Sequence, residues 1–144
     1  MQHEQPVLDL DNIDAVILDM DGVVTRSAGA HAAAWKRMFD DYLKERAREH
    51  GENYVPFDIV NDYSLYVDGK PRYEGAQSFL ESRNIKIPFG SPDDPPEAET
   101  VSGMGNRKNG YFQQYLKENG ADAYKSTVDF IKELKSRGKR VAVI

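Results

Sequence analysis

Residues 15–24 read Ala-Val-Ile-Leu-Asp-Met-Asp-Gly-Val-Val, and this stretch decides the fold of the chain. Its apolar first part has the length and the β-branched content of a buried strand, which we predict over residues 15–20. Two carboxylates one residue apart and then a glycine end the run. On an extended chain, residues i and i+2 point the same way. We therefore expect Asp19 and Asp21 to face one pocket at the carboxyl end of the strand, where open α/β sheets bind ligands.

The two carboxylates form a charge cluster that needs compensation. At a separation of about 5 Å they repel each other by roughly 3 kcal/mol at an effective dielectric constant of about 20. A bound cation such as Mg²⁺, or a protonated partner, relieves this cost. One carboxylate can then attack as a nucleophile while the other moves a proton. The alternative is a pair of solvated loop acids after a core strand.

Composition limits the class of protein. The chain has 144 residues, 40% of them hydrophobic and 30% charged, as in a soluble globular domain. Its formal charge of −5 and pI near 5.2, without a basic stripe, argue against nucleic-acid binding. No apolar run reaches the roughly 18 residues of a membrane span, and no secretory signal is visible, so we expect no membrane partner and a cytoplasmic location. The absence of cysteine excludes disulfides and thiolate zinc sites.

Apolar residues at helical spacing, together with terminal signals, predict four helices. They cover residues 30–50, 74–83, 107–119 and 126–137. Gly51, Gly120 and Gly138 follow three of these helices as stop signals. Ser126 and Asp129 have the spacing of a capping box at the start of the last helix.

A second apolar run at residues 140–144 predicts another buried strand, whereas prolines and glycines argue against regular structure over residues 87–99. The order is therefore strand, long and mostly helical excursion, helix, strand. This is the order of a βαβ crossover that carries a large insertion between the first strand and its helix.

The strand that ends in Asp-x-Asp-Gly-Val, followed by a helical insertion, resembles the haloacid dehalogenase superfamily of aspartate-nucleophile phosphotransferases over residues 13–144. Within it, the chain is most similar to the β-phosphoglucomutase-like branch, whose helical cap follows the first strand. The resemblance implies an α/β fold, a Rossmann-like core of which only the first two parallel strands are present, with an inserted cap. We expect residues 1–27 and 121–144 to form this partial core and residues 28–120 to form the cap.

The family has further motifs after its second strand, and these motifs are absent here. They are a Ser or Thr that holds the phosphate, a Lys or Arg, and an acidic pair that completes the Mg²⁺ site. We therefore expect the chain to be a piece of a longer protein. Parallel strands need covered faces and paired edges, so a partner chain or self-association is expected at the open sheet edge.

The resemblance also gives roles to residues near the first strand. Asp19 would be the nucleophile that forms an aspartyl phosphate, Asp21 the general acid and base, and both would bind Mg²⁺. Gly22 would allow a tight turn that presents N–H groups to the phosphate, with a plain turn glycine as the alternative. Ser27, in the loop that leads to the cap, would touch the phosphate.

Three cap residues match positions that bind substrate in this branch. His31, four residues before Trp35, matches a histidine that links the cap to the general acid and base. Arg72, in a glycine-containing loop, matches an arginine that binds the far phosphate. Lys108, in an Arg-Lys-Asn run, matches a cap residue that faces the site. The alternative is that these are ordinary surface side chains, since exposed basic residues are the rule.

The residues and the resemblance together predict Mg²⁺-dependent phosphoryl transfer on a small phosphorylated metabolite, a sugar phosphate. A dehalogenase needs no acid for its halide leaving group, so Asp21 favours phosphoryl transfer. A phosphatase passes the phosphoryl group to water and a mutase passes it to a bound sugar, and both remain open. The rival hypothesis is a non-catalytic fragment or interaction module of a larger protein, which would gain no thermal stability from Mg²⁺.

Overall fold

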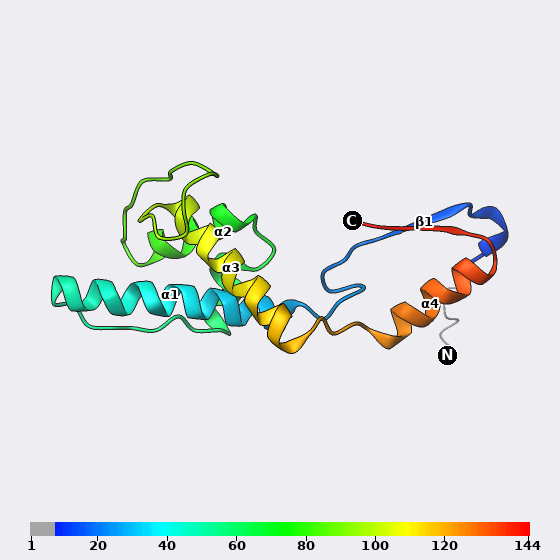
Figure 1. The fold of residues 1–144 in the computed structure, drawn as a ribbon, viewed down its shortest axis with the longest axis horizontal. Helices are drawn as coiled ribbons and strands as arrows, with labels where there is room; N and C mark the ends of the chain where they lie inside the picture. The colour runs from blue at the N-terminus through cyan, green and yellow to red at the C-terminus, as the bar shows by residue number, and fades with distance from the viewer. Residues whose placement is uncertain (1–7) are drawn as a thin grey trace, which may run out of the picture. The chain divides into compact units, whose positions relative to one another are not determined.

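The computed structural model describes residues 8–144, so the first seven residues of the predicted core lie outside it. Figure 1 traces the chain. The elements are the 3₁₀-helix η1, the strands β1 and β2, the helices α1 to α4 and the π-helix η2, in the following order and with the following bounds: η1 (Leu10–Asn12), β1 (Ala15–Leu18), α1 (Ala28–His50), η2 (Tyr63–Val67), α2 (Arg72–Ser82), α3 (Val101–Asn119), α4 (Lys125–Ser136) and β2 (Arg140–Val143).

The described chain divides into two compact units. The strand unit consists of the chain up to Ala28 together with Ala121–Ile144, and the helical unit is Gly29–Gly120. None of the helices between residues 8 and 144 combines the length and the apolar composition that crossing a bilayer requires.

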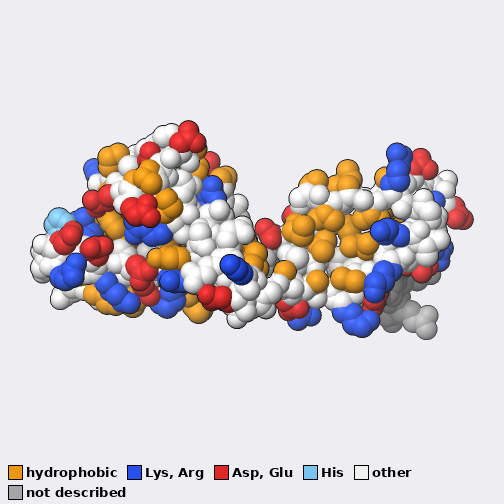
Figure 2. Space-filling model, viewed as in Figure 1, with side chains coloured by type: hydrophobic (Ala, Val, Ile, Leu, Met, Phe, Trp, Pro, Cys, Tyr) orange, Lys and Arg blue, Asp and Glu red, His pale blue; other side chains and the backbone are white. Residues whose placement is uncertain are grey.

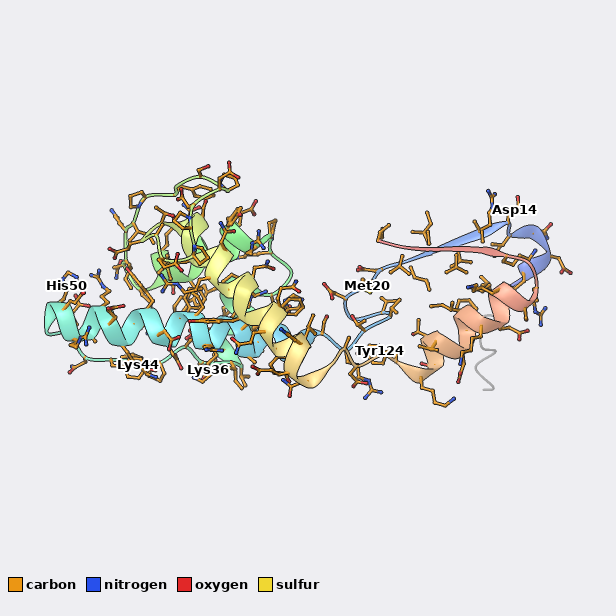
Figure 3. All side chains as sticks on the ribbon, in the orientation of Figure 1. Asp14, Met20, Lys36, Lys44, His50 and Tyr124 are labelled. Carbon is orange, nitrogen blue, oxygen red and sulfur yellow. The ribbon has the colours of Figure 1, made fainter. Side chains whose placement is uncertain are left out.

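In the strand unit, β1 and β2 pair in parallel, as predicted, with Ala15 opposite Arg140 and Leu18 opposite Val143. Both strands are shorter than predicted. The first strand ends at Leu18 and the chain then turns after Met20, which Figure 3 labels. The Met20 carbonyl accepts hydrogen bonds from the N–H groups of residues 24 and 25, at 3.0 and 2.9 Å. Asp19 and Asp21 therefore both lie beyond the strand, so strand alternation sets the direction of neither side chain, and that they face one pocket stays a prediction.

The prediction that the two strands are buried is wrong for the described chain. Helix α4 packs against β2 and buries Leu134 completely. The side chains of Ile17 and Ile144, however, are 66% and 78% exposed. Figure 2 shows hydrophobic side chains gathered at the surface of this unit. One helix covers too little of a parallel sheet, which requires cover on both faces.

Helix α4 begins at Lys125, one residue before the predicted start, and the predicted capping box is wrong. Its N-cap is Tyr124, which makes no side-chain capping bond. Asp129 instead pairs with Lys125, within the helix. The predicted stop at Gly138 is confirmed. This glycine has φ +71°, and its N–H donates to the carbonyl of Lys135 at 3.0 Å, as in a Schellman motif.

The helical unit has its own hydrophobic core, which α1, α2 and α3 enclose. Its centre is a group of aromatic rings in which Phe39 lies 4.1 Å from Phe79 and 5.1 Å from Phe57, between ring centroids. The segment around Phe57 has no regular structure but is fixed by α1. Lys36, labelled on α1 in Figure 3, donates to the Phe57 carbonyl at 3.0 Å, and Asp40 accepts the Phe57 N–H at 2.8 Å.

All three α-helices α1 to α3 begin earlier than predicted, and α1 begins at Ala28 rather than at residue 30. Helix α2 begins at Arg72, directly after Pro71, and α3 begins at Val101 rather than at residue 107. The hydroxyl of Thr100 accepts the N–H of Gly103 at 3.0 Å and so caps α3. The sequence hides this start because glycines argue against a helix. Residues 87–99 contain no helix or strand, as predicted.

Candidate active site

The acidic loop after β1 turns at Gly22, which has φ +79°. This conformation favours glycine, so the predicted turn is confirmed. The Gly22 N–H donates to the carbonyl of Thr25 at 2.8 Å. That amide is therefore engaged within the loop, and phosphate binding at Gly22 stays a prediction.

Residues far along the chain hold this loop in place. Its backbone carbonyl at Val23 accepts the hydroxyl of Thr127 at 2.7 Å, and the carbonyl of Val24 accepts the N–H of Tyr124 at 3.0 Å. The N–H of Arg26 donates to the carbonyl of Asp122 at 2.8 Å. The start of α4 thus fixes the loop that carries the two carboxylates.

Ser27 and Asp21 are in direct contact. The Ser27 hydroxyl donates to Asp21 Oδ1 at 2.7 Å, and Ser27 is only 8% exposed. A short hydrogen bond from a buried hydroxyl fixes the rotamer of the carboxylate that accepts it. The structure therefore places Ser27 in hydrogen-bond contact with the predicted acid and base, whose side chain it can orient, and contact of Ser27 with phosphate stays a prediction.

The donor chemistry near β1 fits Mg²⁺. Asp19 and Asp21 are both exposed, and Mg²⁺ is commonly held by one or two carboxylates plus waters and substrate phosphates. Within residues 8–144 there is no cluster of three or more His, Asp or Glu side chains that could hold a metal by itself. Mg²⁺ binding by these two carboxylates stays a prediction that their chemistry fits.

In the helical unit, His31 and Lys108 meet, although 77 residues separate them. Lys108 Nζ lies 2.8 Å from His31 Nδ1, and Lys108 is only 6% exposed. An ammonium group only donates, so Nδ1 accepts here, and the proton of a neutral ring is on Nε2. The ring of His31 stacks on Phe112 at 4.2 Å, and Lys108 Nζ lies 5.1 Å from the Trp35 ring centroid.

Arg72 lies in the first turn of α2, half-buried. Its Nη2 donates to the hydroxyl of Tyr73 at 3.2 Å, whereas its Nε is buried without a hydrogen-bond partner in the described chain. Arg72 Cγ is 3.3 Å from the position that a Cβ on Gly105 would occupy. Gly105 precedes Lys108 by about one helical turn, so Arg72, on α2, packs against the part of α3 that carries Lys108.

The predicted site residues therefore form two local groups. Asp19, Asp21, Gly22 and Ser27 belong to the strand unit, and His31, Arg72 and Lys108 to the helical unit. Phe112 and Tyr73, which contact His31 and Arg72, were not predicted as their neighbours. The signal for Phe112 was its helical spacing from Lys108, four residues earlier.

Comparison with known proteins identifies the family. The model described as "Hydrolase: haloacid dehalogenase-like hydrolase" matches residues 13–144. A β-phosphoglucomutase of Mycobacterium tuberculosis (strain CDC 1551 / Oshkosh) is 48% identical over 134 residues, which are 93% of this chain and 51% of that protein. An uncharacterized glycosyl hydrolase of the same strain is 39% identical over 137 residues, 95% of this chain and 10% of that protein.

A solved structure agrees with these sequence matches. The β-phosphoglucomutase from Clostridium difficile superposes with a TM-score of 0.60 at 27% identity, over 91% of this chain and 50% of that one. The chain spans about half the length of the β-phosphoglucomutases that it matches. It has the two parallel strands, the acidic loop and the helical insertion expected from its sequence. The chain belongs to the haloacid dehalogenase-like hydrolase family.

Proposed function

We propose that this chain carries the nucleophile and the cap of an enzyme that transfers a phosphoryl group on a small sugar phosphate. The observation that carries the proposal is the loop after β1. There, Asp19 directly follows the strand, and a buried serine holds Asp21 by a hydrogen bond of 2.7 Å. A nucleophile and an oriented proton carrier two residues apart are what this reaction needs.

In the proposed reaction, a carboxylate oxygen of Asp19 attacks phosphorus in line with the ester oxygen. The new O–P bond forms an aspartyl phosphate as the bond from phosphorus to the sugar oxygen breaks. Asp21 gives its proton to that leaving oxygen, and in the second step it takes a proton from the attacking hydroxyl or water. When bound, Mg²⁺ supplies the positive charge that offsets repulsion between the carboxylate and the phosphate dianion.

The helical unit supplies the proposed substrate contacts. Lys108 and Arg72 are partly or wholly buried cations, and charge-assisted hydrogen bonds to phosphate gain strength away from water. A buried donor without a partner, such as Arg72 Nε, costs free energy until an acceptor reaches it. His31 holds Lys108 through its Nδ1 and is proposed to set the direction of that ammonium group.

Transfer to a second sugar position, as in a mutase, is the favoured outcome. Two mycobacterial proteins that share 48% identity over 93% of this chain carry the name β-phosphoglucomutase. A phosphatase would share the first half of the reaction and differ in releasing the phosphoryl group to water.

The proposal is tested with a protein that carries the later family motifs after this chain, because the 144 residues lack them; that protein is incubated with β-glucose 1-phosphate and Mg²⁺. Phosphorylated protein is measured by mass spectrometry after acid quenching, and sugar products are measured by ³¹P NMR. We expect phosphorylation that Asp19→Asn abolishes, with glucose 6-phosphate rather than free phosphate as the main product. A folded protein of this kind that shows neither phosphoprotein nor product would contradict the proposal. Free phosphate as the main product would favour the phosphatase.

A further inference from the structure

A directed chain of hydrogen bonds joins Arg72 to the proline-rich segment, residues 88–99. Arg72 Nη2 donates to the hydroxyl of Tyr73 at 3.2 Å, and that hydroxyl donates to Asn106 Oδ1 at 2.9 Å. Asn106 Nδ2 then donates to the carbonyls of Pro92 and Asp94, both at 2.9 Å. Each group donates toward the segment, so neighbouring bonds polarise one another in the same sense.

Helices α2 and α3, which carry Tyr73 and Asn106, pack closely against each other. A Cβ on Gly105 would lie 2.6 Å from Cδ1 of Tyr73, closer than real Cβ contacts, so only a glycine allows this approach. The ring of Phe89, from the proline-rich segment, contacts Tyr73 edge-on at 6.3 Å between centroids. Tyr73 is therefore fixed at its ring as well as at its hydroxyl.

The proline-rich segment is itself a rigid anchor. Asp94 Oδ2 accepts the hydroxyl of Thr100 at 2.6 Å and the N–H of Ser91 at 3.1 Å. Arg107 Nε donates to the carbonyl of Pro96 at 2.7 Å. Prolines restrict the backbone further. The carbonyls that accept from Asn106 are thus held in fixed positions.

We infer that Tyr73 and Asn106 are positioning residues that aim the guanidinium of Arg72 at the phosphate of a sugar phosphate, with the proline-rich segment as their support. The inference rests on the proposed function, in which Arg72 binds that phosphate. Arginine presents five donors in a rigid fork. Engaging Nη2 with Tyr73 stops the fork from rotating and leaves other donors, including the unpartnered Nε, for the anion. Pre-orientation raises affinity because less freedom is lost on binding.

Two variants each remove one hydrogen-bonding group from the chain of bonds between Arg72 and the proline-rich segment. Tyr73→Phe deletes the hydroxyl and keeps the ring, and Asn106→Leu deletes the amide at similar volume. Tyr111→Phe is the matched control, since its hydroxyl also bonds a side chain, Asp41 at 3.1 Å, but has no link to Arg72. Melting temperatures show that each variant is folded. The two readouts are the guanidinium NMR signals of Arg72 and calorimetric titration with glucose 6-phosphate.

The expected result is slow rotation of the Arg72 guanidinium in the unmodified chain and in Tyr111→Phe, and fast rotation in the other two variants. Affinity for glucose 6-phosphate falls about five- to tenfold in Tyr73→Phe and Asn106→Leu, as the loss of one charge-assisted bond suggests, and stays unchanged in Tyr111→Phe. Unchanged rotation in Tyr73→Phe, or altered rotation with unchanged affinity, would overturn the inference. The proposed function fails separately if Arg72→Ala binds the sugar phosphate as tightly as the unmodified chain.

Discussion

The buried hydroxyl of Ser27 donates a hydrogen bond to the exposed carboxylate of Asp21 and can fix its orientation. We expect Ser27→Ala to slow phosphorylation of the chain by about tenfold, because Asp21 loses the donor that fixes its rotamer. The free energy of unfolding should fall by only about 1 kcal/mol, the usual net value of one hydrogen bond. The rate is measured by acid quenching at early times with β-glucose 1-phosphate. Ser27→Thr keeps the hydroxyl and should recover most of the rate. An unchanged rate in Ser27→Ala would contradict this role.

We expect the helical unit to lose stability at alkaline pH because of Tyr42. Burial, and then a hydrogen bond to Glu99 at 3.0 Å, raise the pKa of Tyr42 from 10.0 to about 12. A raised pKa means that the folded chain holds the phenolic proton more tightly than the unfolded chain does. This contribution to stability is complete below pH 10 and disappears as the pH rises toward 12. Urea unfolding at several pH values should show the loss, and Tyr42→Phe should show less of it.

At the scale of residues, the sequence could nominate candidate side chains but could not predict which of them contact one another. The Asp-x-Asp-Gly pattern selects the acidic loop because its chemistry is local. The contact of Lys108 with His31 joins two helices across 77 residues and depends on how their faces pack. Spacing along one helix contains no such information. The hydrogen bond from Ser27 to Asp21 could not be predicted for a similar reason. It depends on a turn at Gly22 whose shape the sequence pattern does not specify.

At the scale of elements, Gly105 in α3 allows close packing against the ring of Tyr73. We expect Gly105→Ala to lower the free energy of unfolding by about 1–3 kcal/mol, the usual cost of overpacking, because its Cβ would meet the Tyr73 ring at 2.6 Å. Gly110→Ala, in the same helix with nothing within 4 Å of its Cβ, should instead raise stability by up to about 1 kcal/mol through helix propensity. Urea unfolding measures both. The same sign for both variants would contradict the packing argument.

The order of elements and the helix stops were predictable, because alternation, apolar spacing and glycine C-caps are local signals. Helix starts were less predictable. Helix α3 begins six residues early because Thr100 caps it, and its first two glycines serve close packing: Gly103 faces the backbone of Ala98 and Pro95, and Gly105 faces the ring of Tyr73. Helix α4 begins without a side-chain cap, since the loop carbonyl of Val24 takes the N–H of Tyr124. At the start of α3 and at the start of α4, contacts with other parts of the chain therefore matter more than local helix propensity.

At the scale of the molecule, the two units differ in how much apolar surface they bury. All thirteen members of the buried hydrophobic cluster belong to the helical unit. In the strand unit, Leu134 is the hydrophobic side chain buried within the described residues, and Ile17 and Ile144 stay exposed. Since burial of apolar surface supplies most folding free energy, the helical unit should hold most of the stability of this chain.

Amide hydrogen exchange measures this difference directly. We expect the amides of β1 and β2 to exchange at least tenfold faster than those at the centre of α1, because local opening of a two-stranded sheet exposes little additional apolar surface. If the amides of β1 and β2 were as protected from exchange as those of α1 at every chain concentration, this expectation would be contradicted. Protection of β1 and β2 that grows with chain concentration would indicate that copies pair through the open sheet edge, since an unpaired edge is a template for another strand. Protection gained by adding a separate polypeptide would point instead to a partner chain on the same strands.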